Sequence, residues 1–192
     1  DAVAFSYVKS QLADDNPKAT PGAQVVVLKD GKVVFQKGYG TVQAFDFSKN
    51  PAEKIEKPSP VTNETLFDLA SVTKISATTQ VFMHLVYEGK VKLDDKVTKY
   101  LPEFGKNGKE DVTIGQLLSH TSGLPQWKAI YLYSNNRQDT LKYIEDQKLE
   151  FKPGEYKYSD LGFMTLAFVA EKITGEAFDK YVAKTIYGPL GL

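Results

Sequence analysis

The stretch FDLASVTK at residues 67–74 opens a segment whose composition differs from that of the rest of the chain. Between Asp68 and Glu88, Lys74 is the only formally charged residue when His84 is neutral, although 25% of the whole sequence is charged. Apolar residues recur in two stripes at helical spacing, which predicts a helix buried on more than one side. The stripes are Ala70, Ala77, Val81 and Leu85, and Ile75, Phe82 and Val86.

Ser71 and Lys74 are three residues apart, so a helix places the hydroxyl and the amine on one face. Serine becomes a useful nucleophile when a base takes its proton, and burial beside a helix N-terminus lowers the pKa of a lysine towards that role. The alternative is a core helix whose single lysine extends its amine to water. Ser6 and Lys9 have the same spacing on a short amphipathic helix predicted over residues 3–13, where the structural interpretation is favoured.

Tyr158, Ser159 and Asp160 form a second candidate site. They lie between a turn at residues 152–154 and an apolar helix predicted over residues 161–173. Polar residues on a loop between ordered elements are frequent carriers of catalysis. The alternative is that Asp160 serves only as the N-cap of the helix that follows.

Other polar clusters have weaker functional interpretations. Ser119 and His120 are adjacent, a spacing that rarely produces the geometry of a catalytic triad, and the segment is interpreted as the exit of a short helix capped by Thr113. Asp94 and Asp95 are interpreted as solvated turn residues, so a glycosidase has little support.

Composition excludes several further classes. The 192 residues carry 24 basic and 24 acidic side chains, which argues against a nucleic-acid or membrane-surface partner. No apolar run approaches the roughly 20 residues that span a bilayer, and no segment has the pattern of a signal peptide. With no cysteine and two histidines, thiol chemistry and a histidine-rich metal centre are not expected.

A β-hairpin is predicted near the N-terminus. Residues 24–28 and 32–39 are rich in β-branched side chains and flank the turn dipeptide Asp30-Gly31. Their nearly continuous apolar character indicates a sheet covered on at least one face. Residues 41–63 then read as a long loop, a feature that is usually functional or mobile.

Five segments in order resemble the serine β-lactamase and penicillin-binding-protein superfamily, in its class C-like branch of D-Ala-D-Ala carboxypeptidases and esterases. They are FDLASVTK (67–74), GKVKLDDKVTKYLP (89–102), LLSHTSGL (117–124), YSDLG (158–162) and GPLGL (188–192). The resemblance implies that Ser71 is the acylated nucleophile, with its N–H in the oxyanion hole, and that Lys74 is its proton partner. Tyr158 would be the second acid/base group and Asp160 a substrate-binding residue. No metal or organic cofactor is expected.

The resemblance also implies an α+β fold in which an antiparallel sheet lies beside a mainly helical region. Residues 1–192 would be the N-terminal portion of one such domain, with the helix, hairpin and long loop in 1–64 and the helical region with the motifs in 65–192. No convincing strand follows Val112, so the sheet is expected to be incomplete. The missing strands would come from a continuation of the chain, a second polypeptide or a swapped copy, and the 192 residues alone would be inactive.

Two departures from the family pattern bear on the substrate. Asp160 stands where the family motif has asparagine, and an ionised carboxylate beside Lys74 would hold it as an ammonium. The late Lys/His-Ser/Thr-Gly motif is absent, because Lys172-Ile173-Thr174-Gly175 has the wrong spacing and ends a helix. Asp160 favours weak β-lactam turnover, with either an esterase or peptidase preference or a protonated Asp160.

Two functional hypotheses follow. The first is a serine hydrolase or acyltransferase acting on a peptidoglycan peptide, a β-lactam or a small ester. The second is a non-catalytic penicillin-binding-like module that binds a cell-wall peptide or a protein partner. For both, the resemblance implies a bacterial, extracytoplasmic protein: secreted, periplasmic or on the cell surface.

Overall fold

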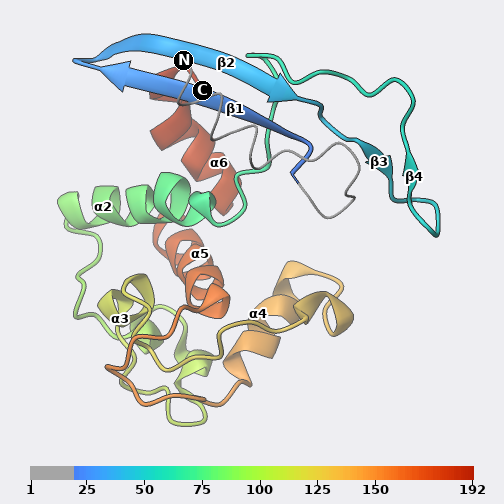
Figure 1. Ribbon diagram of the computed structural model, residues 1–192. Coiled ribbons are helices and arrows are strands. Elements are labelled where there is room, and N and C mark those ends of the chain that lie inside the picture. The colour runs from blue at the N-terminus through green and yellow to red at the C-terminus, as the bar shows by residue number, and fades with distance from the viewer. Residues whose placement is uncertain (1–19) are drawn as a thin grey trace. The chain divides into compact units, whose positions relative to one another are not determined.

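The computed structural model describes residues 20–192, and the chain divides into two compact units, Asp1–Asp68 (unit 1) and Leu69–Leu192 (unit 2) (Figure 1). The helix expected over residues 3–13, with Ser6 and Lys9, lies outside the described residues.

Unit 1 contains the predicted hairpin. Strand β1 (Gly22–Lys29) pairs antiparallel with β2 (Lys32–Gly40), with an irregularity between Val27 and Leu28. The turn residues Asp30 and Gly31 both have positive φ, 51° and 73°, as a two-residue hairpin turn of type I′ requires. The hairpin and its turn are confirmed.

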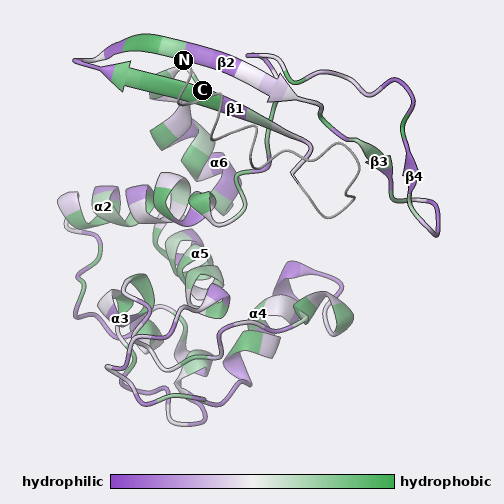
Figure 2. Cartoon of the chain, viewed as in Figure 1, coloured by the Kyte–Doolittle hydropathy of each residue, from purple (hydrophilic) through white to green (hydrophobic). Residues whose placement is uncertain are grey.

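Within the described residues of unit 1, the half of this hairpin next to its turn is uncovered, whereas Tyr39 near the other end is buried. Figure 2 shows hydrophobic residues along β1, and they are solvent-exposed together with those of β2. The exposed side chains are Val26, Val27, Leu28, Val33 and Val34. The reason is that two strands alone cannot bury either of their own faces.

The predicted long loop contains one small regular element. Strand β3 (Phe45–Asp46) pairs antiparallel with β4 (Glu53–Lys54), and the rest of residues 41–63 is irregular. The side-chain amide of Gln24 ties the end of this loop to the hairpin by donating to the carbonyls of Thr62 and Thr65.

Unit 2 is helical. Within residues 20–192 no strand follows β4, apart from an isolated bridge between Lys96 and Thr113. The two small antiparallel sheets and the helical unit together make an α+β chain, as predicted. The elements of unit 2 are η1 (Lys74–Thr78, a π-helix), α2 (Thr79–Tyr87), η2 (Val97–Lys99), η3 (Pro102–Gly105), α3 (Ile114–Leu118), η4 (Ile130–Leu132), α4 (Arg137–Glu145), α5 (Asp160–Thr174), α6 (Phe178–Val182), η5 (Ala183–Tyr187) and η6 (Gly188–Leu190).

The core of unit 2 is built around α5, which contacts α3, α4, α6 and η1 (Figure 1). One side of the helix formed by η1 and α2 faces this core through Ala77, Val81, Phe82 and Leu85. Its other predicted stripe is largely exposed, with Ile75 64% and Val86 39% accessible. Phe82 of this second stripe is buried in the core, so the expectation of a helix buried on more than one side is met at Phe82 and not at Ile75 or Val86.

Local capping signals position the other helices as predicted. Thr113 accepts from the N–H of Gln116, whose side chain bonds back to the Thr113 N–H, so α3 begins with a capping box. Helix α5 ends at Gly175, whose φ of 71° is the left-handed conformation that glycine adopts without strain. Among the described residues, no helix combines the length and apolar character needed to cross a membrane.

The interpretation of Asp94 and Asp95 as solvated turn residues is wrong for Asp95. Its side chain is only 14% exposed and accepts hydrogen bonds from the Tyr100 hydroxyl, the Lys92 N–H and the Lys99 ammonium. Burial raises the pKa of Asp95, but these hydrogen bonds outweigh it and lower the pKa to about 2. Asp95 is therefore a structural anchor of the turn before η2.

Candidate active site

Ser71 lies at a sharp bend just before the helix. Ala70 has a φ of 43°, which is rare for a residue with a side chain and costs of order 1 kcal/mol or more. Helical backbone begins at Val72, so the helix predicted from Asp68 starts several residues later. The Ser71 carbonyl accepts from the Lys74 N–H at 3.1 Å, and this first turn brings the two side chains to the same side.

Three predicted catalytic side chains meet at the Ser71 hydroxyl. Lys74 Nζ lies 3.2 Å from Ser71 Oγ, and the Tyr158 hydroxyl donates to the same oxygen at 2.7 Å. Tyr158 is 87 residues away from Ser71 in the sequence and arrives on the loop before α5. The hydroxyl of Ser71 is thus within hydrogen-bond distance of two groups that exchange protons.

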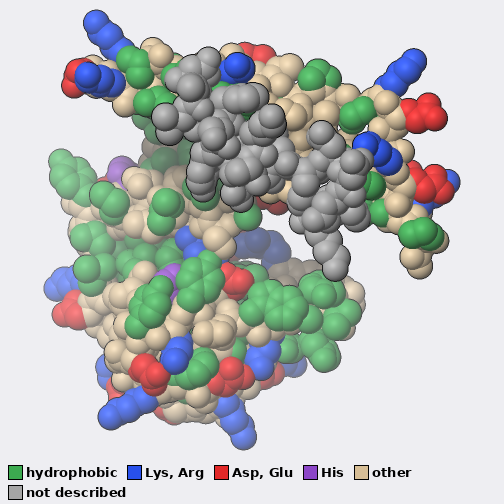
Figure 3. Space-filling model, in the orientation of Figure 1, with side chains coloured by type: hydrophobic (Ala, Val, Ile, Leu, Met, Phe, Trp, Pro, Cys, Tyr) green, Lys and Arg blue, Asp and Glu red, His purple; other side chains and the backbone are tan. Residues whose placement is uncertain are grey.

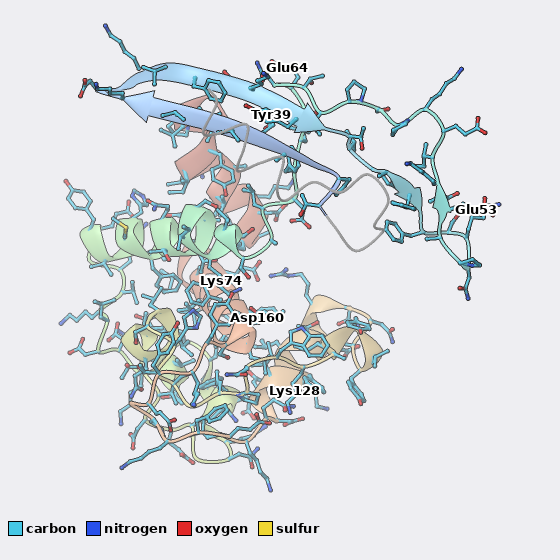
Figure 4. All side chains as sticks on the ribbon, in the orientation of Figure 1. Tyr39, Glu53, Glu64, Lys74, Lys128 and Asp160 are labelled. Atoms are coloured by element: carbon cyan, nitrogen blue, oxygen red, sulfur yellow. The ribbon has the colours of Figure 1, made fainter. Side chains whose placement is uncertain are left out.

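Asp160 also belongs to this cluster and is not the N-cap of α5. The N-cap is Ser159, whose Oγ accepts from the Gly162 N–H at 3.1 Å, so the interpretation of Asp160 as a mere N-cap is wrong. Asp160 occupies the first turn, and its Oδ1 lies 2.6 Å from Lys74 Nζ. Figure 4 shows Lys74 and Asp160 close together where η1 and α5 adjoin.

The charge state of Lys74 differs from the simple expectation for a buried amine. Its side chain is 15% exposed, and this burial lowers the pKa as predicted. The hydrogen bonds and charges of Asp160 and Tyr158 act in the opposite direction and raise the pKa of Lys74 above its ordinary value. The ion pair with Asp160 therefore keeps Lys74 as an ammonium in the resting site at neutral pH.

His120 is a site residue that the sequence interpretation missed. Its Nδ1 accepts from the Ser159 N–H at 3.0 Å, and its ring centroid lies 4.5 Å from that of Tyr158 and 4.9 Å from that of Phe163. Burial, followed by the charge of Lys74, lowers the pKa of His120. The segment is the exit of α3, as expected, and it also holds Tyr158 in place.

Backbone contacts extend this support. The Lys157 N–H donates to the His120 carbonyl at 2.8 Å, and the Asp160 N–H donates to the Gln126 carbonyl at 2.9 Å. The Ser159 hydroxyl donates to the Pro125 carbonyl at 2.6 Å. One signal for this role was available: His120 is one of only two histidines and stands inside a family-like motif.

The sequence matches the model of a known protein family. The family model described as Beta-lactamase matches residues 10–192, which is nearly the whole chain. The chain belongs to the beta-lactamase family. The matched range includes Ser71, Lys74, Tyr158 and Asp160.

Individual relatives agree with this assignment. An Escherichia coli K12 protein named "Putative D-alanyl-D-alanine carboxypeptidase" is 38% identical over 186 residues, covering 90% of this chain and 42% of the relative. The octameric penicillin-binding protein homologue from Pyrococcus abyssi is similar with a TM-score of 0.78 and 29% identity, over 99% of this chain and 43% of that one. EstCE1, described as a hydrolase with promiscuous acyltransferase activity, has a TM-score of 0.78 and 26% identity, over 100% of this chain and 51% of that one. The chain thus spans less than half the length of the curated relative that it matches.

Proposed function

We propose that this protein is a serine hydrolase or acyltransferase that works through an acyl-enzyme on Ser71. The observation that carries the proposal is the position of Ser71 Oγ, 3.2 Å from Lys74 Nζ and 2.7 Å from the Tyr158 hydroxyl. A serine flanked by two proton-exchanging groups is the arrangement that nucleophilic catalysis requires. The names of the Escherichia coli relative and of EstCE1 support the same reaction class.

The resting ion pair sets the first step. Lys74 holds a proton that it must release before it can act as a base, and Asp160 Oδ1 is 2.6 Å away. Transfer of this proton to Asp160 leaves a neutral amine next to the Ser71 hydroxyl and a protonated carboxyl. Because neither product is charged, entry of a substrate that excludes water favours the transfer.

Acylation and deacylation then follow with all protons accounted for. The Lys74 amine takes the Ser71 proton as Oγ bonds to the substrate carbonyl carbon, and the Ser71 N–H stabilises the oxyanion. Tyr158 donates its proton to the leaving group, the bond to that group breaks, and the acyl group remains on Ser71. The Tyr158 phenolate next takes a proton from water as the water oxygen bonds to the acyl carbon. The bond between that carbon and Ser71 Oγ breaks, the acid product leaves, and Oγ recovers its proton from Lys74. Return of the proton from Asp160 to Lys74 restores the resting ion pair.

For the substrate we propose a peptidoglycan peptide, a small ester or a β-lactam, with β-lactams turned over weakly. A carboxylate at Asp160 accepts hydrogen bonds but, when ionised, donates none to a substrate carbonyl, unlike the amide of the family motif. The name of the Escherichia coli relative points to a D-alanyl peptide and thereby to an extracytoplasmic bacterial location.

We also propose that residues 1–192 are the N-terminal portion of one domain and are inactive by themselves. The exposed valines of β1 and β2 indicate that further strands pack on the hairpin, from a continuation of the chain, a second polypeptide or a swapped copy. Comparing acylation by the 192-residue chain with acylation by the full-length protein tests this. Measurable turnover by a monomer of the 192 residues contradicts it.

The reaction itself is tested by covalent labelling. The full-length protein is incubated with a fluorescent penicillin and, separately, with an activated phosphonate, and the modified peptide is identified by mass spectrometry. We expect an adduct on Ser71 that Ser71→Ala abolishes, whereas Ser6→Ala, which alters the other serine three residues before a lysine, leaves it intact. Absence of any adduct with both reagents favours the non-catalytic wall-binding module instead.

A further inference from the structure

A groove of about 480 Å³ lies on unit 2. Apolar and aromatic side chains of Trp127, Ile130, Tyr131 and Met164 supply most of its accessible lining surface. The other lining residues are polar or charged: Lys128, Ser134, Asn135, Asn136, Arg137 and Thr140. Trp127 is 60% exposed, Tyr131 73% and Met164 41%, so these large side chains meet solvent on a folded surface. Figure 3 shows hydrophobic side chains gathered on this part of unit 2, near α4. Apolar surface of this kind commonly marks a binding site.

Helix α5 and one backbone hydrogen bond connect the groove to Asp160 of the candidate site. Met164 follows Asp160 by one turn of α5, so the two side chains share a face of that helix. Trp127 follows Gln126, whose carbonyl accepts from the Asp160 N–H at 2.9 Å. The groove therefore begins within one helical turn of the carboxylate that contacts Lys74.

The charges around the groove are already neutralised. Lys128 pairs with Glu150 at 2.8 Å, and Arg137 pairs with Glu171 at 2.6 Å. Both amide atoms of a further lining residue, Asn136, are engaged with Asp139. These cations and this amide are not available to a substrate carboxylate, which leaves the apolar surface as the main recognition element.

We propose that this groove is the subsite for the acyl side of the substrate and selects an uncharged aromatic or large apolar group. The inference rests on the proposed acylation of Ser71 and deepens it by naming the substrate class. Ser71 has two neighbours with different roles. We assign Tyr158 to the leaving group, and we assign the groove to the group that remains on Ser71 because the groove adjoins Asp160 through Met164 on α5.

Selectivity is tested with two esters that share a leaving group. We expect kcat/KM of the full-length protein for p-nitrophenyl 3-phenylpropanoate to exceed that for p-nitrophenyl acetate by about tenfold or more, as burial of a phenyl group implies. Trp127→Ala and, separately, Tyr131→Ala should lower this ratio several-fold. Tyr87→Ala, which removes a 90% exposed aromatic at the end of α2, should leave the ratio unchanged.

Binding of a ligand in the groove is tested separately, in protein that cannot be acylated. Trp127 is the only tryptophan in the 192 residues, so its emission reports on the groove. In Ser71→Ala protein, 3-phenylpropanamide should change the emission saturably, and Trp127→Phe in the same background should remove that change. If Ser71 proves not to be acylated, the proposed function fails while this titration still judges the groove. An ester ratio insensitive to both groove variants, or no emission change at millimolar amide, overturns the subsite.

Discussion

Two lysines of unit 2 are withdrawn from solvent in different surroundings. Lys109 is fully buried, and its ammonium donates to three backbone carbonyls, those of Lys106 at 2.8 Å, Glu145 at 2.9 Å and Gln147. Lys74 is less buried, and its contacts are side chains: a hydroxyl, a phenol and a carboxylate. Carbonyls cannot take a proton at neutral pH, whereas the groups around Lys74 can exchange one. Burial of a lysine is therefore a poor guide to chemistry until its partners are known.

The pKa directions strengthen this lesson. Burial lowers the pKa of Lys109, while its carboxylate partner raises the pKa of Lys74 despite burial. Judged by pKa alone, Lys109 resembles a general base more than Lys74 does, yet no serine hydroxyl is among the partners of its ammonium. The neighbouring Ser71 hydroxyl, rather than the direction of the shift, identifies the candidate site.

Removal of Lys74 should have the largest effect. Lys74→Ala is expected to slow acylation of Ser71 by 10² to 10⁴-fold, the loss typical of a general acid/base, while the protein still folds. Stopped-flow measurement of acylation by an activated ester checks this. Native-like acylation by the variant would mean that the proton of Ser71 leaves by another route.

Removal of the Lys109 amine should lower stability and leave acylation intact, the opposite of what is expected for Lys74. Lys109→Met leaves three buried carbonyls without their donor and is expected to lower the free energy of unfolding by about 3 kcal/mol. For a chain of this size that corresponds to a melting temperature lower by roughly 6–12 °C. Acylation by the protein that remains folded should be retained.

The matched control for Lys109→Met is Lys106→Met. Lys106 has a half-exposed side chain paired with Glu103 at 2.7 Å, and such surface pairs contribute little to stability. A change in unfolding free energy within about 0.5 kcal/mol is expected. Equal losses in the two variants would contradict the structural role of Lys109.

The same contrast explains what could be predicted from the sequence. The hairpin turn at Asp30-Gly31, the Thr113 cap and the stop at Gly175 depend on residues within a few positions of one another, so local patterns were sufficient. The burial of Lys109 depends on carbonyls up to 38 residues away, and no local pattern contains that information. Resemblance to a family singled out Ser71 and Tyr158 where spacing alone left the question open.

Errors at the site have the same origin. Ser159 and Asp160 are both good N-cap residues, and only the tertiary contact with Lys74 shows which of the two is free for another task. Likewise the raised pKa of Lys74 depends on the ion pair that its own segment does not contain. The resemblance to the family motif placed Asp160 beside Lys74 and predicted the ammonium, whereas burial alone predicted the opposite pKa direction.

Asp160→Asn should sharpen the difference between the two lysines. Loss of the carboxylate removes the interaction that raises the pKa of Lys74, so burial is opposed by less and the free amine forms at lower pH. We expect penicillin acylation to increase by about tenfold at neutral pH, with the alkaline rise in the acylation rate shifted to lower pH. Asp94→Asn, at an exposed carboxylate, is the control. Efficient penicillin hydrolysis by the native protein, made slower by Asp160→Asn, would contradict this role.

The smallest expected effect concerns His120, which links the Lys74 site to folding stability. Its lowered pKa means that the folded protein binds a proton less readily than the unfolded chain, in which histidine titrates near 6.5. The contribution of His120 to the free energy of unfolding is therefore complete above about pH 6.5 and is lost as the pH drops through the lower pKa of the folded state. The physical cause is that a protonated Nδ1 cannot accept from the Ser159 N–H and adds a positive charge near Lys74.

His120→Asn tests this link, because asparagine tolerates the φ of 57° at this position and does not titrate in this range. At pH 7.5 the variant should be less stable than the native protein by about 1 kcal/mol, through loss of the imidazole acceptor and its ring contacts. At pH 5 that gap should narrow, because the unfolded native chain, in which histidine titrates near 6.5, binds a proton that folded His120 binds less readily. Urea unfolding at both pH values measures the gap, with His84→Asn as the control for loss of an imidazole elsewhere. A gap that stays constant would mean that His120 supports Tyr158 by packing alone.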